Sequence, residues 1–149
     1  PGDREESRYR GRWQHFSVEN GLPHININGI CAGAGTTWVG TGFYTRGGLA
    51  EIVDAETGVH VGRVVTRDDG LAGEKVRSLC RDSTGTIWVG SEYDGLAYAT
   101  GAGWRLLTTA DGLIHNEVKA IVEDRDGFLW LGTRDGITRI PPDRRGMTL

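Results

Sequence analysis

Hydrophobic positions along this chain fall in short runs that are separated by turn residues. In the clearest example, the β-rich run 118–122 is followed by a turn at 124–127 and by a second apolar run at 128–132. Another turn at 134–136 precedes a third run at 137–140. No segment keeps a helical period over roughly 11 residues. The pattern predicts an all-β chain of short antiparallel strands.

The same pattern occurs three times, in the aligned segments 20–41, 69–91 and 111–133. Each segment opens with Asn or Asp followed by Gly-Leu, contains a Trp-x-Gly step, and is followed by Gly and an apolar residue. The second and third units share one spacing, whereas the first carries extra residues between Gly40 and Gly70. A fourth strand is expected before each opening, at 13–18, 62–65 and 104–108.

Four short strands in a unit of about 40 residues are typical of a β-propeller blade. We therefore expect an all-β fold of three propeller repeats over 13–141, a half or partial propeller, with tails at 1–12 and 142–149. Trp38, Trp88 and Trp130 should be buried at equivalent places, each stacking on the next blade. The Gly two residues after each Trp should let neighbouring blades approach closely.

Composition narrows the class of protein. Gly makes up 24 of the 149 residues but does not recur at every third position, which excludes collagen. Because 38% of the residues are hydrophobic and five are Trp, the composition also excludes a linker or a disordered chain. No apolar run approaches the roughly 18 residues of a membrane span. A net charge of −3 does not suggest a nucleic-acid-binding face. Because the chain opens at Pro1 without Met, we expect a processed or trimmed N-terminus, from which any targeting segment has been removed.

The third repeat carries the motif 111–113 (DGL), His115-Asn116, Asp124, Gly127, Leu129-Trp130, Gly132-Thr133 and Gly136. It resembles the two-component regulator propeller repeat, which builds the periplasmic sensor propellers of bacterial hybrid histidine kinases. The second repeat departs from the family at Ala72-Gly73, and the first lacks the Asp of the turn. The resemblance implies a propeller fold and a periplasmic or extracellular location. The family pattern is structural, so it implies no catalytic residue.

The number of repeats leaves two interpretations open. Propellers of this family usually have about seven blades, and a ring needs at least about four. Two copies of the chain could form a homodimer with a closed six-bladed ring, in which 13–18 of one copy completes the blade at 118–140 of the other. Alternatively, the chain is a piece of a longer propeller that supplies the remaining blades.

The candidate ligand site follows from the strand order, because the loops after the outer strand and after the second strand should emerge at one end of the blades. Aromatic faces there can stack on sugar C–H groups, and charged side chains can hold hydroxyls, so we expect a small molecule or glycan. The alternative is that these are ordinary polar loop residues. The candidate ligand-binding residues are His24, Tyr44, Arg46, Glu92, Tyr93, His115, Asn116, Arg134 and Asp135.

The remaining candidate metal and disulfide sites have structural explanations. The segment 124–127 opens like a calcium loop but lacks the later ligands, so a plain turn is favoured. His24 and His115 occupy equivalent turns, where a structural role is favoured over a metal site. Cys31 and Cys80 match Val122, which indicates apolar core positions that are too far apart for a disulfide. We expect no cofactor and no metal.

The function that these observations favour is a non-catalytic ligand-binding or sensor module of a signalling receptor. One alternative is a protein–protein assembly module that uses an open blade edge. Another is a propeller lyase or hydrolase, for which His115 and Glu92 would be the acid–base candidates. No recognisable catalytic motif is present in the sequence, so an enzyme is the least favoured of the three.

Overall fold

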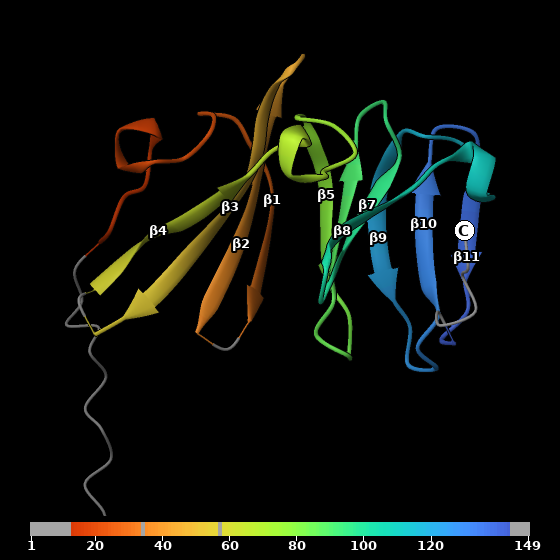
Figure 1. Cartoon of the computed structure of the whole chain (residues 1–149). Helices are drawn as coiled ribbons and strands as arrows, with labels where there is room; N and C mark the ends of the chain where they lie inside the picture. Colours follow the sequence, from red (N-terminus) through yellow and green to blue (C-terminus); the bar gives the residue numbers. More distant parts are fainter. Residues whose placement is uncertain (1–12, 34, 57, 144–149) are drawn as a thin grey trace, which may run out of the picture.

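The computed structural model describes residues 13–33, 35–56 and 58–143 (Figure 1). Its strands form three antiparallel meanders in which each strand pairs with the next along the chain. The first sheet contains β1 (Ile27–Gly33), β2 (Thr36–Phe43), β3 (Arg46–Ala55) and β4 (Gly58–Val65). The second contains β5 (Val76–Arg81), β6 (Ile87–Ser91), β7 (Leu96–Thr100) and β8 (Gly103–Leu107). The third contains β9 (Val118–Glu123), β10 (Leu129–Thr133) and β11 (Ile137–Ile140).

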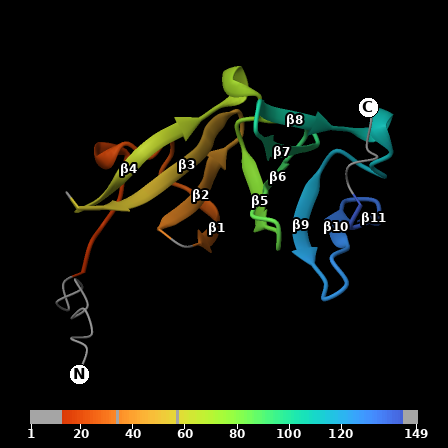
Figure 2. The same cartoon turned by 60° about the horizontal axis from the view of Figure 1, so that its bottom comes forward.

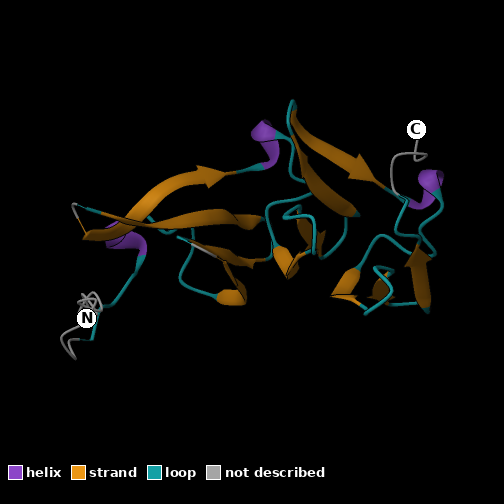
Figure 3. Ribbon diagram, turned by 90° about the horizontal axis from the view of Figure 1, so that it is seen from below, coloured by secondary structure: helices purple, strands orange, loops and turns teal. Residues whose placement is uncertain are grey.

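The three sheets lie side by side like consecutive blades. Their first strands are neighbours, with β5 between β1 and β9 (Figure 2). Seen from below, the first and third sheets lie at opposite ends of the array (Figure 3). The expected all-β architecture of propeller blades is confirmed, and the described helices are three short 3-10 turns, η1 (Val18–Asn20), η2 (Arg67–Asp69) and η3 (Thr109–Asp111).

Each 3-10 turn explains one Asx-Gly-Leu opening. The Asx side chain accepts a hydrogen bond from the backbone N–H of the residue that caps the turn, as Asp69 does from Thr66 at 2.8 Å. The following Gly is left-handed, with φ of 101°, 109° and 107° at Gly21, Gly70 and Gly112. Gly takes this conformation without steric cost, so the motif ends the turn and sends the chain into the next blade.

The core lies between the blades. Trp38 belongs to a buried cluster with Leu71, Val76 and Val89 of the second blade, and Trp88 belongs to a second cluster with residues of the third blade. A Cβ on Gly40 would clash with Val76, and one on Gly90 would lie 2.7 Å from the carbonyl oxygen of Val118. The Trp-x-Gly step therefore stacks one blade on the next, as the repeat predicts.

Two expectations about the ends of the chain are wrong. Residues 13–17 are not a strand, and Val18 begins η1, because no neighbouring strand in the described part of the chain offers this segment a partner. Trp130 is 36% exposed, whereas Trp88 is 1% exposed, because no further blade covers the outer face of the third sheet in the described residues.

The two cysteines are free thiols that pack against the two inter-blade clusters, in agreement with their expected place on the inner strands. Burial is the largest cause of the raised pKa of the Cys80 thiol. Val122, at the matching position of the third blade, is exposed because it lies on the uncovered face.

Candidate functional site

The three 3-10 turns and the hairpin loops that follow the second strand of each blade gather at one end of the molecule (Figure 1). This is the arrangement that the strand order predicts. Each of the nine candidate residues lies in one of these loops or at its border with a strand. The loop end is therefore the place to look for a site.

The β2–β3 hairpin carries the most unusual backbone at this end. Tyr44 begins its two-residue turn with φ of 53°, which makes it the one non-glycine residue with positive φ among those described. An aromatic residue rarely adopts this conformation, and such strain is concentrated at functional sites. The ring of Tyr44 meets that of Phe43 edge to face, with centroids 4.3 Å apart.

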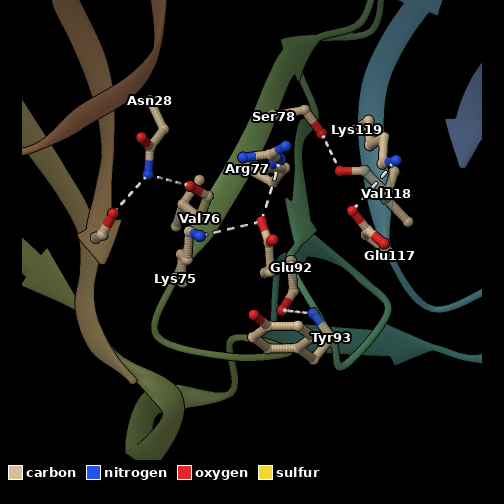
Figure 4. A network of polar contacts seen from close by, with 12 residues as sticks. Asn28, Lys75, Val76, Arg77, Ser78, Glu92, Tyr93, Glu117, Val118 and Lys119 are labelled. Atoms are coloured by element: carbon tan, nitrogen blue, oxygen red, sulfur yellow. Dashed lines mark hydrogen bonds and ion pairs between the residues drawn. The ribbon is translucent and has the colours of Figure 1, made fainter. Parts of the chain in front are cut away.

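The hairpin is held firmly against the second blade. Asn28 Nδ2 donates to the carbonyl oxygens of Gly42 and Val76, at 2.8 and 2.9 Å, and so joins the two blades (Figure 4). A Cβ on Gly42 would lie 2.9 Å from Lys75 Cα. Glycine at this position therefore permits the close approach that presents Tyr44 over the second blade.

A pocket of about 140 Å³ lies where the hairpin meets the second blade. It brings together two of the predicted residues, Tyr44 and Tyr93, whose side chains are both largely exposed. Its other lining residues are Thr45, Arg67, Glu74, Lys75, Ser91 and Asp94. Arg67 and Asp94 both line the pocket and form an ion pair, with Arg67 Nη2 4.0 Å from Asp94 Oδ1.

Arg67 and Asp94 were not among the sequence candidates. Asp94 directly follows Tyr93 in the same loop, and its position could have identified it. Arg67 lies in η2, and only the packing of two blades shows that it faces a tyrosine from the preceding repeat. Two acidic and two basic side chains balance one another around the pocket.

Glu92 lies beside this pocket but does not line it. Its Oε2 forms ion pairs with Lys75 Nζ at 3.3 Å and Arg77 Nε at 3.1 Å rather than well-aligned hydrogen bonds (Figure 4). Its backbone N–H donates to the carbonyl oxygen of Lys75 at 3.2 Å. Glu92 thus braces the loop that carries Lys75, which is a supporting role.

The two repeat-equivalent histidines stabilise turns. His24 Nδ1 accepts a hydrogen bond from Asn26 N at 3.0 Å, and His115 Nδ1 accepts one from Glu117 N at 2.8 Å. His115 Nε2 also lies 4.0 Å from Asp135 Oδ2. Each ring thus takes part in a local turn through its Nδ1 atom. Within the described ranges, no group of three or more His, Cys, Asp or Glu could hold a metal ion.

The remaining candidates are spread over the loop end. Asn116 Oδ1 accepts from Thr109 N at 2.8 Å, and the carbonyl oxygen of Asn116 accepts from Gly95 N at 2.9 Å, so this residue links η3 to the β6–β7 loop. Arg46 and Arg134 are exposed on separate hairpins. The structure therefore unites the two tyrosines and leaves the arginines apart.

A family comparison matches the second and third repeats. The model of the "Two component regulator propeller" family aligns with residues 70–93 and 112–135. Both matched segments begin at the left-handed Gly that follows a 3-10 turn and end in the loop after the second strand. The second and third repeats of this chain are therefore two component regulator propeller repeats. The first repeat has the same strand order, but it departs from the family motif at Ala32 and in its longer hairpins.

Solved structures share the fold of this chain. It superposes on the extracellular domains of two proteins of B. thetaiotaomicron described as hybrid two component systems: BT3049, at TM-score 0.70 and 23% identity over 85% of the chain, and BT4673, at 0.62 and 22% over 81%. It also superposes on PorZ, a surface component of the type-IX secretion system of Porphyromonas gingivalis, at 0.55 and 14% over 80%.

The chain spans 17% of each of the first two solved chains and 20% of the third. A search of curated proteins found no match. Among the described residues, no helix has the length and apolar character needed to cross a membrane.

Proposed function

We propose that this chain is part of a non-catalytic sensor propeller, located in the periplasm or outside the cell, that binds a small polar molecule or a glycan for a signalling receptor. Its family and its fold support the proposal, because two of the similar solved structures are extracellular domains of proteins described as hybrid two component systems. The blade junction supplies a candidate place for the ligand.

The observation that carries the proposal is the pocket between Tyr44 and Tyr93. Tyr44 keeps a strained backbone whose cost, of order 1–3 kcal/mol, needs a compensating role. Two exposed aromatic rings offer flat apolar faces, and Glu74, Asp94, Arg67 and Lys75 supply donors and acceptors around them. Because the two acids balance the two bases, the pocket suits a neutral ligand with many hydroxyl groups better than a strongly charged one.

The test is a glycan-array screen with the intact chain, followed by saturation-transfer NMR on the oligosaccharides it retains. Tyr44→Asn removes the ring, and Asn tolerates the left-handed backbone, so the hairpin keeps its shape. Tyr44→Asn and Tyr93→Ala should each weaken binding about tenfold or more, which corresponds to about 1.4 kcal/mol. Arg125→Ala, in the exposed turn between β9 and β10 at the opposite end of the third blade, is the matched control. Unchanged binding in both tyrosine variants would reject the site.

We also propose an assembly role for the uncovered face of the third blade. Val122, Trp130 and Ile137 are exposed there, although the corresponding side chains of the second blade are covered by the third. An uncovered apolar face favours association. The face is completed either by remaining blades of a longer propeller or by a second copy that closes a six-bladed ring.

A further inference from the structure

We infer that residues 13–16 of a second copy of this chain add to the free edge of β11 as the fourth strand of the third blade, with Trp13 filling the pocket above Gly112. The inference rests on the proposal that further strands complete the third blade. Of the two possible sources of these strands, it selects a second copy of the chain over the remaining blades of a longer propeller. It is independent of ligand binding at the loop end.

The acceptor is a free strand edge beside a pocket. In the described part of the chain the third sheet ends at β11, where the first and second sheets continue to β4 and β8. A pocket of about 180 Å³ lies along this edge, between Leu107 and Leu113 on one side and Thr138 and Ile140 on the other, with Gly112 in its wall.

The second blade shows what fills the corresponding place. There, Trp104 of the fourth strand packs over Gly70, so that a Cβ on Gly70 would lie 3.0 Å from Trp104 Cβ. The Trp104 ring also meets Trp38 edge to face, with centroids 6.4 Å apart. Gly112 is the repeat equivalent of Gly70, but a Cβ built on it would meet nothing within 4 Å. The pocket above Gly112 is therefore the unfilled equivalent of the Trp104 site.

The donor has the sequence of a fourth strand. Aligned on the Gly-Leu of each opening, Trp13 corresponds to Trp104 and Phe16 to Leu107. Trp13 is 90% exposed, the largest exposed fraction of any large hydrophobic side chain described. The chain thus carries the missing tryptophan at one end and the pocket for it at the other.

The donor segment also lies where a fourth strand of a preceding blade would lie. Phe16 packs against Leu22, Val39 and Ala50 on the free face of the first blade. Leu107 in the same way joins the cluster of Leu113 at the face of the third blade. The segment runs along the side of the first sheet that is remote from the second (Figure 1). It is therefore placed to pair with a strand from another molecule.

The β7–β8 pair fixes the expected register. Leu96 pairs with Leu107, Tyr98 with Arg105 and Ala99 with Trp104. Transferred to the equivalent residues, this register places Ile137 opposite Phe16, Arg139 opposite Gln14 and Ile140 opposite Trp13. Backbone hydrogen bonds would hold the added strand, as in other cases of strand addition between proteins.

The blade faces fit the same arrangement. A Cβ on Gly90 would clash with the third blade, but one on Gly132 would meet only Ala120 Cβ at 3.4 Å. Val118 of the third blade covers Gly90 of the second. Its equivalent in the first blade is Ile27, which is exposed. In the assembly, Ile27 of one copy would cover Gly132 of the other. The contact is head to tail, and two copies complete six blades.

The test is the mass of the intact chain in sedimentation velocity at micromolar concentrations, without ligand. We expect a dimer of twice 16.2 kDa. Trp13→Ala should raise the dissociation constant at least about tenfold. The control Gln14→Ala should leave the constant unchanged, because its equivalent Arg105 is an exposed position.

Gly132→Ala tests the acceptor face, since the added methyl would meet the partner and little within its own chain. It should lower the dimer fraction while the far-UV spectrum stays unchanged, and this holds even if a Trp13 variant folds poorly. A monomeric intact chain, or Trp13→Ala and Gly132→Ala variants with unchanged mass, would overturn the inference and leave the blade to be completed by a longer propeller. Because no ligand is present, this result is separate from the outcome at the tyrosine pocket.

Discussion

At the scale of single residues, the repeat motif joins a turn carboxylate to the stacking tryptophan. Asp82 Oδ2 accepts from Trp88 Nε1 at 2.8 Å, and Asp82 Oδ1 accepts from the backbone N–H groups of Thr84 and Thr86, both at 2.9 Å. Asp124 does the same for Trp130 in the third repeat. Both carboxylate oxygens of Asp124 are thus used within the repeat, by the turn 124–127 and by the Trp130 ring. The motif positions the ring that stacks on the next blade.

Trp88→Ala should lower the free energy of unfolding by roughly 3–5 kcal/mol, because a fully buried ring is lost and a cavity remains. Trp104→Ala should cost less, because that ring is only partly buried at the outer strand. Chemical denaturation of the two variants measures both values. Small and equal effects would contradict the stacking of one blade on the next.

The Asp124–Trp130 pair predicts a pH effect. The hydrogen bond from Trp130 Nε1 is the largest cause of the lowered pKa of Asp124. The stability that this carboxylate contributes is therefore present above the usual aspartate pKa of about 3.9, and it is lost as the pH falls through the lower folded-state value. A carboxyl NMR titration should show the low midpoint, and Trp130→Phe should raise it. A midpoint unchanged by Trp130→Phe would contradict this assignment.

Alanine substitutions at the equivalent positions Gly90 and Gly132 should have different effects on stability. Gly90→Ala should destabilise the chain, because the new Cβ would collide with Ser78 Oγ of its own sheet and would lie 2.7 Å from the carbonyl oxygen of Val118 in the next blade. Gly132→Ala should be tolerated in the monomeric chain at low concentration. Thermal unfolding of both variants compares them, and equal losses would mean that Gly90 is required for a reason other than blade packing.

At the scale of elements, the strand predictions were correct where a strand and the strand it pairs with lie in the same repeat. The predicted strand 137–140 has the observed bounds of β11, and 62–65 lies at the end of the longer β4. The extra residues of the first repeat lengthen the β2–β3 and β3–β4 hairpins, which the repeat pattern could not define. The segment 13–18 was predicted as a strand from its likeness to 104–108, but strand pairing depends on a neighbour as well as on sequence.

The inter-blade bridge formed by Asn28 should stiffen the β2–β3 hairpin. Asn28→Ala removes the donor to the carbonyl oxygens of Gly42 and Val76, and an unsatisfied carbonyl that is shielded from water costs about 1–3 kcal/mol. Hydrogen exchange at Phe43–Arg46 should become faster. Asn26→Ala is the control, because Asn26 meets Gly42 through its backbone carbonyl. Equal exchange in the two variants would show that Asn28 does not hold the hairpin.

At the scale of the whole molecule, the repeat identifies the fold but not the pocket. Tyr44 comes from the extra residues of the first repeat, whereas Arg67, Tyr93 and Asp94 come from two loops around the second blade. No single repeat contains this combination, so only the packing of neighbouring blades shows it. The equivalent candidates His24 and His115 belong to the first and third repeats, and the second blade lies between them.

The open ends follow from the same architecture. Each blade covers the tryptophan of the blade before it, so an array of blades leaves one tryptophan exposed at one end and one free face at the other. In this chain these are Trp130 and the face that Phe16 partly covers. In the proposed assembly, stability and association are coupled, because the free blade edge gains a fourth strand from the second copy.

Hydrogen exchange of the intact chain as a function of its concentration tests the strand addition between two copies most directly. We expect the amides of Ile137–Ile140 and of residues 13–16 to become protected together as the concentration rises, while β6 at the centre of the second blade is protected throughout. Trp13→Ala should remove the concentration-dependent protection at both segments. Free exchange at both segments at every concentration, or protection of one without the other, would contradict the pairing of these two strands.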